Sequence, residues 1–227
     1  MKWWEKTVEY YFVCNFLKLG YFAMPLDGTY EAIGDTIFID DDRQFLLVEF
    51  KKDKASIPTE KNKFENYENF INCIYEKMYL YENNDILCDF PDQTELVQGI
   101  DFDGKIRELA KMTRFHIIVY GQLENKYLSL KYVNYYYPEI EQCHGDIFYC
   151  RTKDIEKFKY YIKAFLTCKF SPDGPSGQSS ARNFLSYTYI FGISKNSKHI
   201  TFISLYDYLY DNSGKDRGES ETNFLYI

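Results

Sequence analysis

The sequence lacks the features that mark several common classes of protein. No apolar run approaches the roughly 20 residues of a membrane-spanning helix, so we expect no membrane partner and, by default, a cytoplasmic protein. The chain contains no P-loop, dinucleotide-binding fingerprint, EF-hand loop or nucleophile elbow, which argues against the enzyme and binding classes that these motifs define. It also has no internal repeat.

A net positive charge is missing as well. The chain has 27 Lys and Arg residues against 34 Asp and Glu residues, a formal net charge of -7. This balance argues against a protein that coats nucleic acid through a wholly basic surface. It does not exclude a nuclease, because acidic groups around metal ions lower the total charge and basic residues need only be concentrated locally.

Cysteine pairs at metal-binding spacing are absent. The six cysteines are scattered and fall largely in apolar segments, as reduced core cysteines do, so we expect no disulfides. Cys143, His144 and Cys150 lie close in sequence, but they form no Cys-x2-Cys pair and have no fourth ligand at a standard interval. A zinc site is therefore disfavoured.

What the chain has is a large apolar and aromatic fraction. Its 227 residues are 45% hydrophobic and 19% aromatic, which favours one substantial core with elaborations over two independent domains. The only Gly/Pro/Ser-rich segment spans 171–180, and we interpret it as a loop or a short linker.

Hydrophobic periodicity predicts an α/β fold with a mixed central sheet flanked by helices. Apolar residues at intervals of three and four predict helices over 3–19, 59–81, 104–112 and 153–167, the third of them capped by Asp103. Short apolar or alternating runs predict strands over 30–33, 35–39, 44–51, 115–120, 127–133, 146–150 and 183–194. The segment 52–58 is expected to be a polar loop, and 200–210 is ambiguous.

Asp35, Glu49 and Lys51 lie on two consecutive predicted strands. If the strands pair as a hairpin, the carboxylates can converge on a cation that prefers oxygen ligands, for which Mg²⁺ is the natural choice. Alternate side chains of a strand share a face, so Glu49 and Lys51 point the same way while Phe50 points into the core. A metal here lowers the pKa of bound water and neutralises phosphate oxygens, while the lysine orients the water or offsets developing charge. These are the minimum groups for a magnesium-dependent phosphodiesterase.

A simpler interpretation is that Asp35 is a turn residue and that Glu49 and Lys51 form the solvent face of a half-buried strand. The run 45–48 is apolar on both faces, which argues against this, because such a buried strand should not end in accidental charge. Glu9 lies at the margin of the apolar face of the first predicted helix, where a carboxylate needs a metal or a lysine as its partner. An exposed helix residue explains Glu9 equally well.

The order of these features resembles the PD-(D/E)xK phosphodiesterase superfamily, which has the restriction-endonuclease-like nuclease fold. A helix with a glutamate is followed by a hairpin with Gly34-Asp35, then by Glu49-x-Lys51 and a second helix, and the similarity covers about residues 3–80. Gly34 stands where the family name has proline, a change that removes no metal ligand.

The resemblance implies a nuclease-like core over 1–120 and a C-terminal extension, 121–227, that completes or decorates the same domain. It also implies roles: two carboxylates bind the metal, the lysine acts on the nucleophile, and the helical glutamate completes the site. In this chain, the positions that match the catalytic residues of the family are Asp35, Glu49, Lys51 and Glu9. Those that match its metal ligands are Asp35, Glu49 and the backbone carbonyl of Phe50.

The function implied is a metal-dependent nuclease that hydrolyses phosphodiester bonds in DNA, with Mg²⁺ as the cofactor and Mn²⁺ as a substitute. The alternative is a catalytically inactive nuclease-like module that acts in nucleic-acid or protein binding. Many such nucleases act as dimers, so we expect a homodimer or a partner protein. The candidates for phosphate contact, which a solvated loop explains as well, are Lys52, Lys54, Lys61 and Lys63, with Glu60 as an auxiliary group.

Two further features have structural interpretations that we favour over functional ones. His116 lies in an apolar run and is better explained as a hydrogen-bonded core histidine than as a general base. The tyrosines of 132–137 could stack bases, but a buried or edge strand explains them better.

Overall fold

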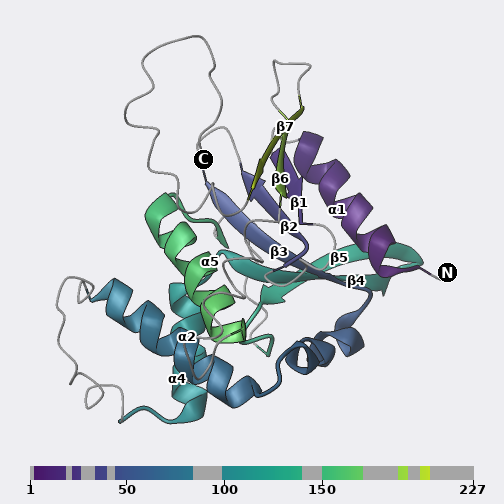
Figure 1. The fold of residues 1–227 in the computed structure, drawn as a ribbon. Helices are drawn as coiled ribbons and strands as arrows, with labels where there is room; N and C mark the ends of the chain where they lie inside the picture. Colours follow the sequence, from purple (N-terminus) through teal and green to yellow (C-terminus); the bar gives the residue numbers. More distant parts are fainter. Residues whose placement is uncertain are drawn as a thin grey trace, which may run out of the picture.

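The computed structural model describes residues 3–18, 22–26, 34–39, 44–83, 99–139, 150–170, 189–193 and 200–204, and it has an α/β architecture (Figure 1). Its helices are α1 (Glu5–Lys18), the 3₁₀ helix η1 (Lys54–Lys63), α2 (Tyr67–Glu82), α4 (Phe102–Met112) and α5 (Ile155–Phe170). Its strands are β1 (Phe22–Pro25), β2 (Thr36–Ile39), β3 (Phe45–Lys51), β4 (His116–Glu124), β5 (Tyr127–Asn134), β6 (Tyr189–Ile193) and β7 (Ile200–Ser204). Within these described ranges, no helix has the length and apolar character needed to cross a membrane.

Strands β1 to β5 form one mixed sheet in the order β1-β2-β3-β4-β5, and β6 and β7 form a separate antiparallel pair. The first three make an antiparallel meander, β4 runs parallel to β3, and β5 returns antiparallel to β4. A parallel pair needs a crossover connection, and η1, α2 and α4 lie on that connection between β3 and β4. The predicted mixed sheet flanked by helices is therefore confirmed.

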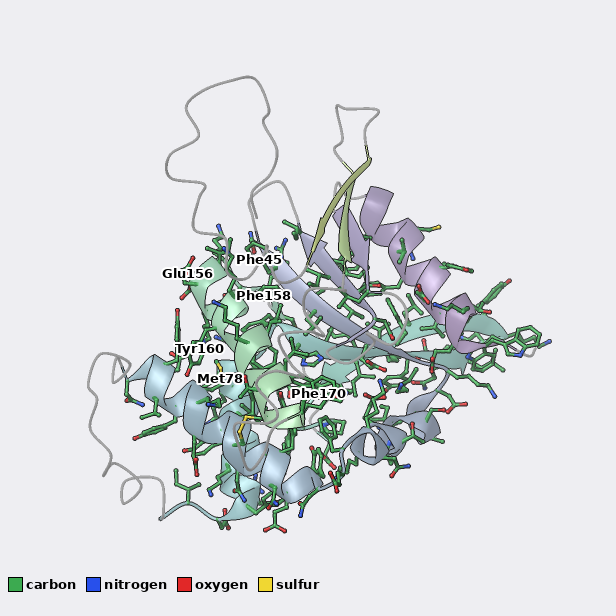
Figure 2. The ribbon with its side chains drawn as sticks, in the orientation of Figure 1. Phe45, Met78, Glu156, Phe158, Tyr160 and Phe170 are labelled. Atoms are coloured by element: carbon green, nitrogen blue, oxygen red, sulfur yellow. A yellow bond between two sulfur atoms is a disulfide. The ribbon has the colours of Figure 1, made fainter. Side chains whose placement is uncertain are left out.

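Helices cover both faces of this sheet, with α1 on one face and α2, α4 and α5 on the other (Figure 1). All seven residues of β3 are buried, and they alternate between the two faces. Phe45 stacks on Phe158 of α5 with ring centroids 5.0 Å apart (Figure 2). On the other face, the ring of Phe50 meets Phe12 of α1 edge-on at 5.5 Å. A central strand packed on both faces explains why the run 45–48 carries no polar residue.

The predicted helix 59–81 is wrong at its start, and so is the polar loop predicted before it. The chain forms the 3₁₀ helix η1 from Lys54 onward, and α2 follows as a separate helix. Pro58 lies inside η1 and has no N–H to donate, which disfavours a continuous α-helix through this segment. Asn66 then starts α2 anew, because its side chain accepts a hydrogen bond from the N–H of Asn69.

Most of the other predicted elements are confirmed. The helices α1, α4 and α5 and the strands β2 to β5 lie where periodicity predicts them. Strand β1 is not indicated by the sequence, where Pro25 favours a turn. Asp101 rather than Asp103 caps α4, since its Oδ1 accepts a hydrogen bond from Gly104 N at 2.7 Å. The predictions that fall outside the described residues are the strands 30–33 and 146–150, the loop 171–180 and parts of the segments 183–194 and 200–210.

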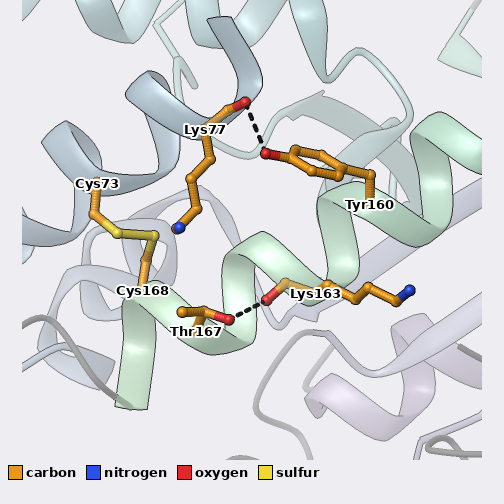
Figure 3. The surroundings of a disulfide bond; sticks show 6 residues. All are labelled: Cys73, Lys77, Tyr160, Lys163, Thr167 and Cys168. Atoms are coloured by element: carbon orange, nitrogen blue, oxygen red, sulfur yellow. Dashed lines mark hydrogen bonds between the residues drawn. A yellow bond between two sulfur atoms is a disulfide. The ribbon is translucent and has the colours of Figure 1, made fainter. Parts of the chain in front are cut away.

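A disulfide between Cys73 and Cys168 joins α2 to α5, so the prediction of no disulfides is wrong (Figure 3). The two cysteines are 95 residues apart in sequence, and their pairing depends on two helix faces that meet only in the folded chain. Close by, Tyr160 Oη donates a hydrogen bond to the carbonyl oxygen of Lys77 at 3.2 Å and ties the same two helices together. Among the described residues, Cys14 is exposed and free, and Cys150 is buried.

Candidate active site

The β2–β3 hairpin sets Asp35 beside Glu49. The register pairs Thr36, the residue after Asp35, with Val48, the residue before Glu49. The regular ladder ends there, because Asp35 N donates to Val48 O at 2.9 Å, one residue out of register. The Asp35 carboxylate is then held against β3 by a 2.5 Å hydrogen bond to its Oδ2 from Phe50 N. The pairing of β2 with β3 expected from the sequence is confirmed.

Glu49 and Lys51 point to the same face of β3, the face covered by η1 and α2. Glu49 is 2% exposed and Lys51 is 6% exposed. The interpretation of these residues as a solvent face is therefore wrong. Lys51 Nζ donates a 2.7 Å hydrogen bond to Glu49 Oε1, and this pairing offsets part of the free-energy cost of burying both groups.

The helix η1 adds Glu60 and Lys63 to this pair. Lys51 Nζ lies 2.6 Å from Glu60 Oε1, and Lys63 Nζ lies 2.6 Å from Glu49 Oε1 and 3.0 Å from Glu60 Oε2. Residues at i and i+3 eclipse one another in a 3₁₀ helix, which is why Glu60 and Lys63 reach the same point. Two carboxylates and two amines thus alternate in a closed cluster, which we call the four-charge cluster.

Two residues that the sequence analysis did not select also reach the four-charge cluster. Tyr135 Oη, at the end of β5, donates to Glu60 Oε2 at 3.3 Å. Glu5 Oε2, in the first turn of α1, lies 3.9 Å from Lys51 Nζ. Tyr135 comes from a distant part of the chain, and the order of strands in the sheet brings it here. Glu5 is on the same stripe of the first helix as Glu9, and the packing of α1 brings it to Lys51.

The side chain of Glu9 contacts a different partner from the metal site that the resemblance implies for it. Its Oε2 forms a 2.7 Å ion pair with Lys6 Nζ on the same helix. The carboxylate of α1 that approaches Lys51 is that of Glu5, about one helical turn earlier.

The buried carboxylates have strongly perturbed pKa values. Burial, followed by repulsion from Asp35 and Glu60, raises the pKa of Glu49 to about 8, although Lys63 and Lys51 lower it. Burial also opposes ionisation of Glu60, but Lys63 and Lys51 outweigh it and the pKa of Glu60 is lowered. The pKa of Lys51 is raised, because attraction from Glu49 and Glu60 outweighs burial. Lys51 is therefore a permanent cation.

The remaining predicted lysines lie around this cluster. Lys52, Lys54 and Lys61 are exposed, whereas Lys63 is in the four-charge cluster itself. Lys52 Nζ lies 3.9 Å from a carboxylate oxygen of Asp53, and Lys61 Nζ lies 5.2 Å from the centre of the Tyr67 ring. Three cations therefore remain on the surface near the end of β3.

His116 is a core residue, as predicted. Its side chain is fully buried, its Nδ1 lies 2.5 Å from Tyr161 Oη, and its ring stacks on Tyr135 at 3.8 Å. Burial, with a further contribution from Lys63, lowers the pKa of His116 well below its usual range. Tyr135 and Tyr136 are buried too, so base stacking by these two tyrosines is excluded.

The oxygen atoms predicted to bind a metal are those of Asp35, Glu49 and the Phe50 carbonyl. Across the part of the chain that the structure describes, no group of three or more His, Cys, Asp or Glu side chains is arranged to hold a metal ion. The donor set that remains is two carboxylates, Asp35 and Glu49, with the backbone carbonyl of Phe50, and such oxygen ligands suit Mg²⁺.

Comparison of the chain with protein-family models, with curated proteins and with solved structures finds no match. The case for a function therefore depends on the geometry of the site.

Proposed function

We propose that this protein is a metal-dependent nuclease that hydrolyses phosphodiester bonds in DNA, built on a restriction-endonuclease-like core. The observation that carries the proposal is the pair Asp35 and Glu49 at the end of β3, with Lys51 bonded to Glu49. The meander β1-β2-β3 followed by a parallel β4 supports it, since this order sets the carboxylates on two neighbouring interior strands beside the crossover helices.

Asp35, Glu49 and the Phe50 carbonyl would hold the magnesium ion, which supplies an activated water and neutralises phosphate oxygens. Lys51 acts as a fixed cation, because its raised pKa keeps it protonated. Its role is to hydrogen-bond the attacking water or a non-bridging phosphate oxygen and to offset the negative charge of the transition state. Glu60 keeps Lys51 in place through the 2.6 Å ion pair.

A catalytically inactive binding module is the second candidate, and one observation favours it. Every member of the four-charge cluster has an ion-pair partner within the cluster, so the cluster is already neutralised by the protein's own lysines. In that case the exposed Lys52, Lys54 and Lys61 would serve binding alone.

Incubation of the purified protein with supercoiled plasmid, single-stranded DNA and RNA, in Mg²⁺ or Mn²⁺, separates the two candidates. The nuclease proposal requires cleavage that EDTA stops and that Asp35→Asn and Lys51→Ala each abolish. Lys111→Ala is the matched control, because Lys111 pairs with Glu108 on the surface of α4, with its side chain 70% exposed. Circular dichroism establishes that each variant is folded. Binding without cleavage by the folded wild type would favour the inactive module.

A homodimer, a partner protein and a cytoplasmic location remain predictions. Size-exclusion chromatography with light scattering tests for the homodimer, and affinity capture from cells tests for the partner protein. The Cys73–Cys168 disulfide argues against a cytoplasmic location, because disulfides are rare in cytosolic proteins.

A further inference from the structure

The last turn of α5 carries a further lysine, Lys169, on the side of the sheet that holds the four-charge cluster. Glu49 and Lys51 share their face of β3 with Phe45, because alternate residues of a strand point the same way. Phe45 stacks on Phe158 of α5, so α5 packs on this same face. The helix that carries Lys169 and the four-charge cluster are therefore on one side of the sheet.

Aromatic contacts place the end of α5 beside η1. Lys169 Nζ lies 5.3 Å from the ring centre of Phe64, the residue that follows Lys63 at the end of η1. Phe165, about one turn earlier in α5, contacts the rings of both Phe64 and Tyr135, with centroids 6.1 Å apart in each case. Tyr135 in turn donates its hydrogen bond into the four-charge cluster. The amine of Lys169 is thus held at the border of the cluster, on the side of Lys63.

The position of this last turn is fixed by a covalent bond and by ring contacts. Cys168, the residue before Lys169, forms the disulfide with Cys73 of α2 (Figure 3). The amine also lies 6.0 Å from the ring centre of Phe165 and 5.9 Å from that of Phe170. A side chain that is already placed loses less freedom when it binds a ligand. Lys169 is therefore pre-organised for a contact at the border of the cluster.

The two lysines are the more exposed groups on this side of the site. The side chains of Glu49, Lys51 and Glu60 are 3%, 8% and 7% exposed. The side chain of Lys63 is 28% exposed, and Lys169 is half-buried. A ligand that approaches from solvent on this side therefore meets the amines of Lys63 and Lys169 before it meets the buried carboxylates.

The charges around Lys169 favour an anionic ligand. Burial, followed by repulsion from Lys63, lowers the pKa of Lys169 to about 8, although attraction from Glu60 and Glu49 raises it. The carboxylates of the cluster thus do not compensate fully for the burial of this cation beside a second one. A phosphate that contacts both amines would supply further negative charge, and lysine binds phosphate as a point charge.

We infer that Lys169, together with Lys63, binds a backbone phosphate of the nucleic acid next to the phosphodiester that is cleaved. The inference rests on the proposed function for the identity of the ligand. Phosphate contacts fix the register and orientation of a bound strand and carry no sequence information. Lys169 is therefore a substrate-positioning residue that the C-terminal half of the chain contributes to the site.

Binding of a fluorescein-labelled DNA duplex to the full-length protein is measured by anisotropy, in EDTA and in Ca²⁺, at several salt concentrations. Lys169→Met keeps an apolar stem on the aromatic rings and removes the charge. It should weaken binding about 10-fold, the loss expected from one charge-assisted contact. The slope of log K against log salt should become shallower by about 1, because one phosphate contact is lost. Lys169→Arg keeps the charge and should retain both the affinity and the slope.

Lys163→Met is the matched control. Lys163 is on the same helix and is half-buried, and burial, followed by repulsion from Lys159, lowers its pKa as well. The carboxylate that acts on Lys163 is that of Glu156, not one from the four-charge cluster. Its substitution should change neither the affinity nor the salt slope. Circular dichroism establishes that each variant is folded.

A second measurement needs no substitution. Lysine amines of the wild type are acetylated with acetic anhydride at a pH near the pKa of Lys169, about 8, with and without the duplex. Mass spectrometry then compares the modification of Lys169 with that of Lys163. Bound DNA should protect Lys169 and leave the acetylation of Lys163 unchanged.

The outcomes separate this inference from the nuclease proposal. Four results would each overturn the phosphate contact, even if the protein cleaves plasmid: wild-type affinity and slope in Lys169→Met, an equal loss in Lys163→Met, no protection of Lys169, or no binding by the wild type in either buffer. Binding and protection that depend on Lys169, without any cleavage, would support the contact and count against the nuclease.

Discussion

Glu60 Oε1 lies 2.6 Å from Lys51 Nζ, and this contact connects the 3₁₀ helix η1 to the end of β3. Glu60 is 5% exposed and also accepts a hydrogen bond from Tyr135 Oη. It is therefore the residue through which η1, β3 and β5 hold the proposed catalytic lysine in one position.

Glu60→Ala should destabilise the protein by about 3 kcal/mol or more, because removal of one partner leaves buried charges without compensation. Urea unfolding followed by circular dichroism measures the change in the free energy of unfolding. Glu108→Ala is the control: Glu108 pairs with Lys111 on the surface, where a pair contributes about 0–1 kcal/mol. Equal effects of the two substitutions would show that Glu60 is not a buried anchor.

Lys63→Met should increase the stabilisation of the protein by Mg²⁺. Lys63 Nζ bonds Glu49 Oε1 at 2.6 Å and so competes with a metal for that oxygen. A ligand that binds the folded state stabilises it by an amount that grows with the logarithm of the ratio of ligand concentration to dissociation constant, and the melting temperature rises accordingly. The measurement is the melting temperature with increasing Mg²⁺, compared with Lys61→Met, in which an exposed lysine near the cluster is removed. A smaller Mg²⁺ shift in Lys63→Met than in the wild type would contradict the competition.

Asp35→Asn should lower the pKa of Glu49 from its value of about 8, since Asp35 is the largest charge effect that raises it. An NMR titration of ¹³C-labelled glutamate in metal-free buffer measures this pKa. With a folded pKa raised above the usual 4.5, the folded protein binds a proton that the unfolded chain releases. The contribution of Glu49 to stability therefore falls as pH rises from about 4.5 to about 8. In Asp35→Asn this decline should end at a lower pH, and an unchanged pH range would argue against close approach of the two carboxylates.

Cys73→Ser should lower the free energy of unfolding by about 4 kcal/mol, because the disulfide closes a loop of nearly 100 residues in the unfolded chain. Unfolding with and without dithiothreitol measures the effect, and reduction should remove the difference between variant and wild type. Cys14→Ser is the control, since Cys14 is exposed and free. Alkylation of unreduced protein followed by mass spectrometry tests the bond directly: two additional modified cysteines in native protein from cells would show that it is open there.

The hairpin and its charged residues could be predicted from sequence because the information is local. Alternation along β3 assigns Glu49 and Lys51 to one face and Phe50 to the other, and pairing with β2 then fixes Asp35. The contacts of Glu60 could not be predicted in the same way. The sequence predicts an α-helix from residue 59, whereas the segment is a 3₁₀ helix, which directs the side chain of Glu60 differently.

The rest of the site depends on contacts between distant parts of the chain. Tyr135 reaches Glu60 because β5 pairs with β4, and Glu5 reaches Lys51 because α1 packs across the sheet. The Cys73–Cys168 bond likewise requires α2 and α5 to be adjacent. Residue spacing contains no information on these distances, which follow from the topology of the sheet.

The alternation of β3 between two cores has a consequence for how the strand finds its place. A shift of pairing by one residue would turn every side chain to the opposite face. Such a shift would carry the charges of Glu49 and Lys51 into the aromatic layer formed by Phe12 and Phe16 of α1. A shifted pairing of β3 would therefore be less stable than the native one. Glu49 and Lys51, which are proposed to act in catalysis, thus also favour the native register of the central strand.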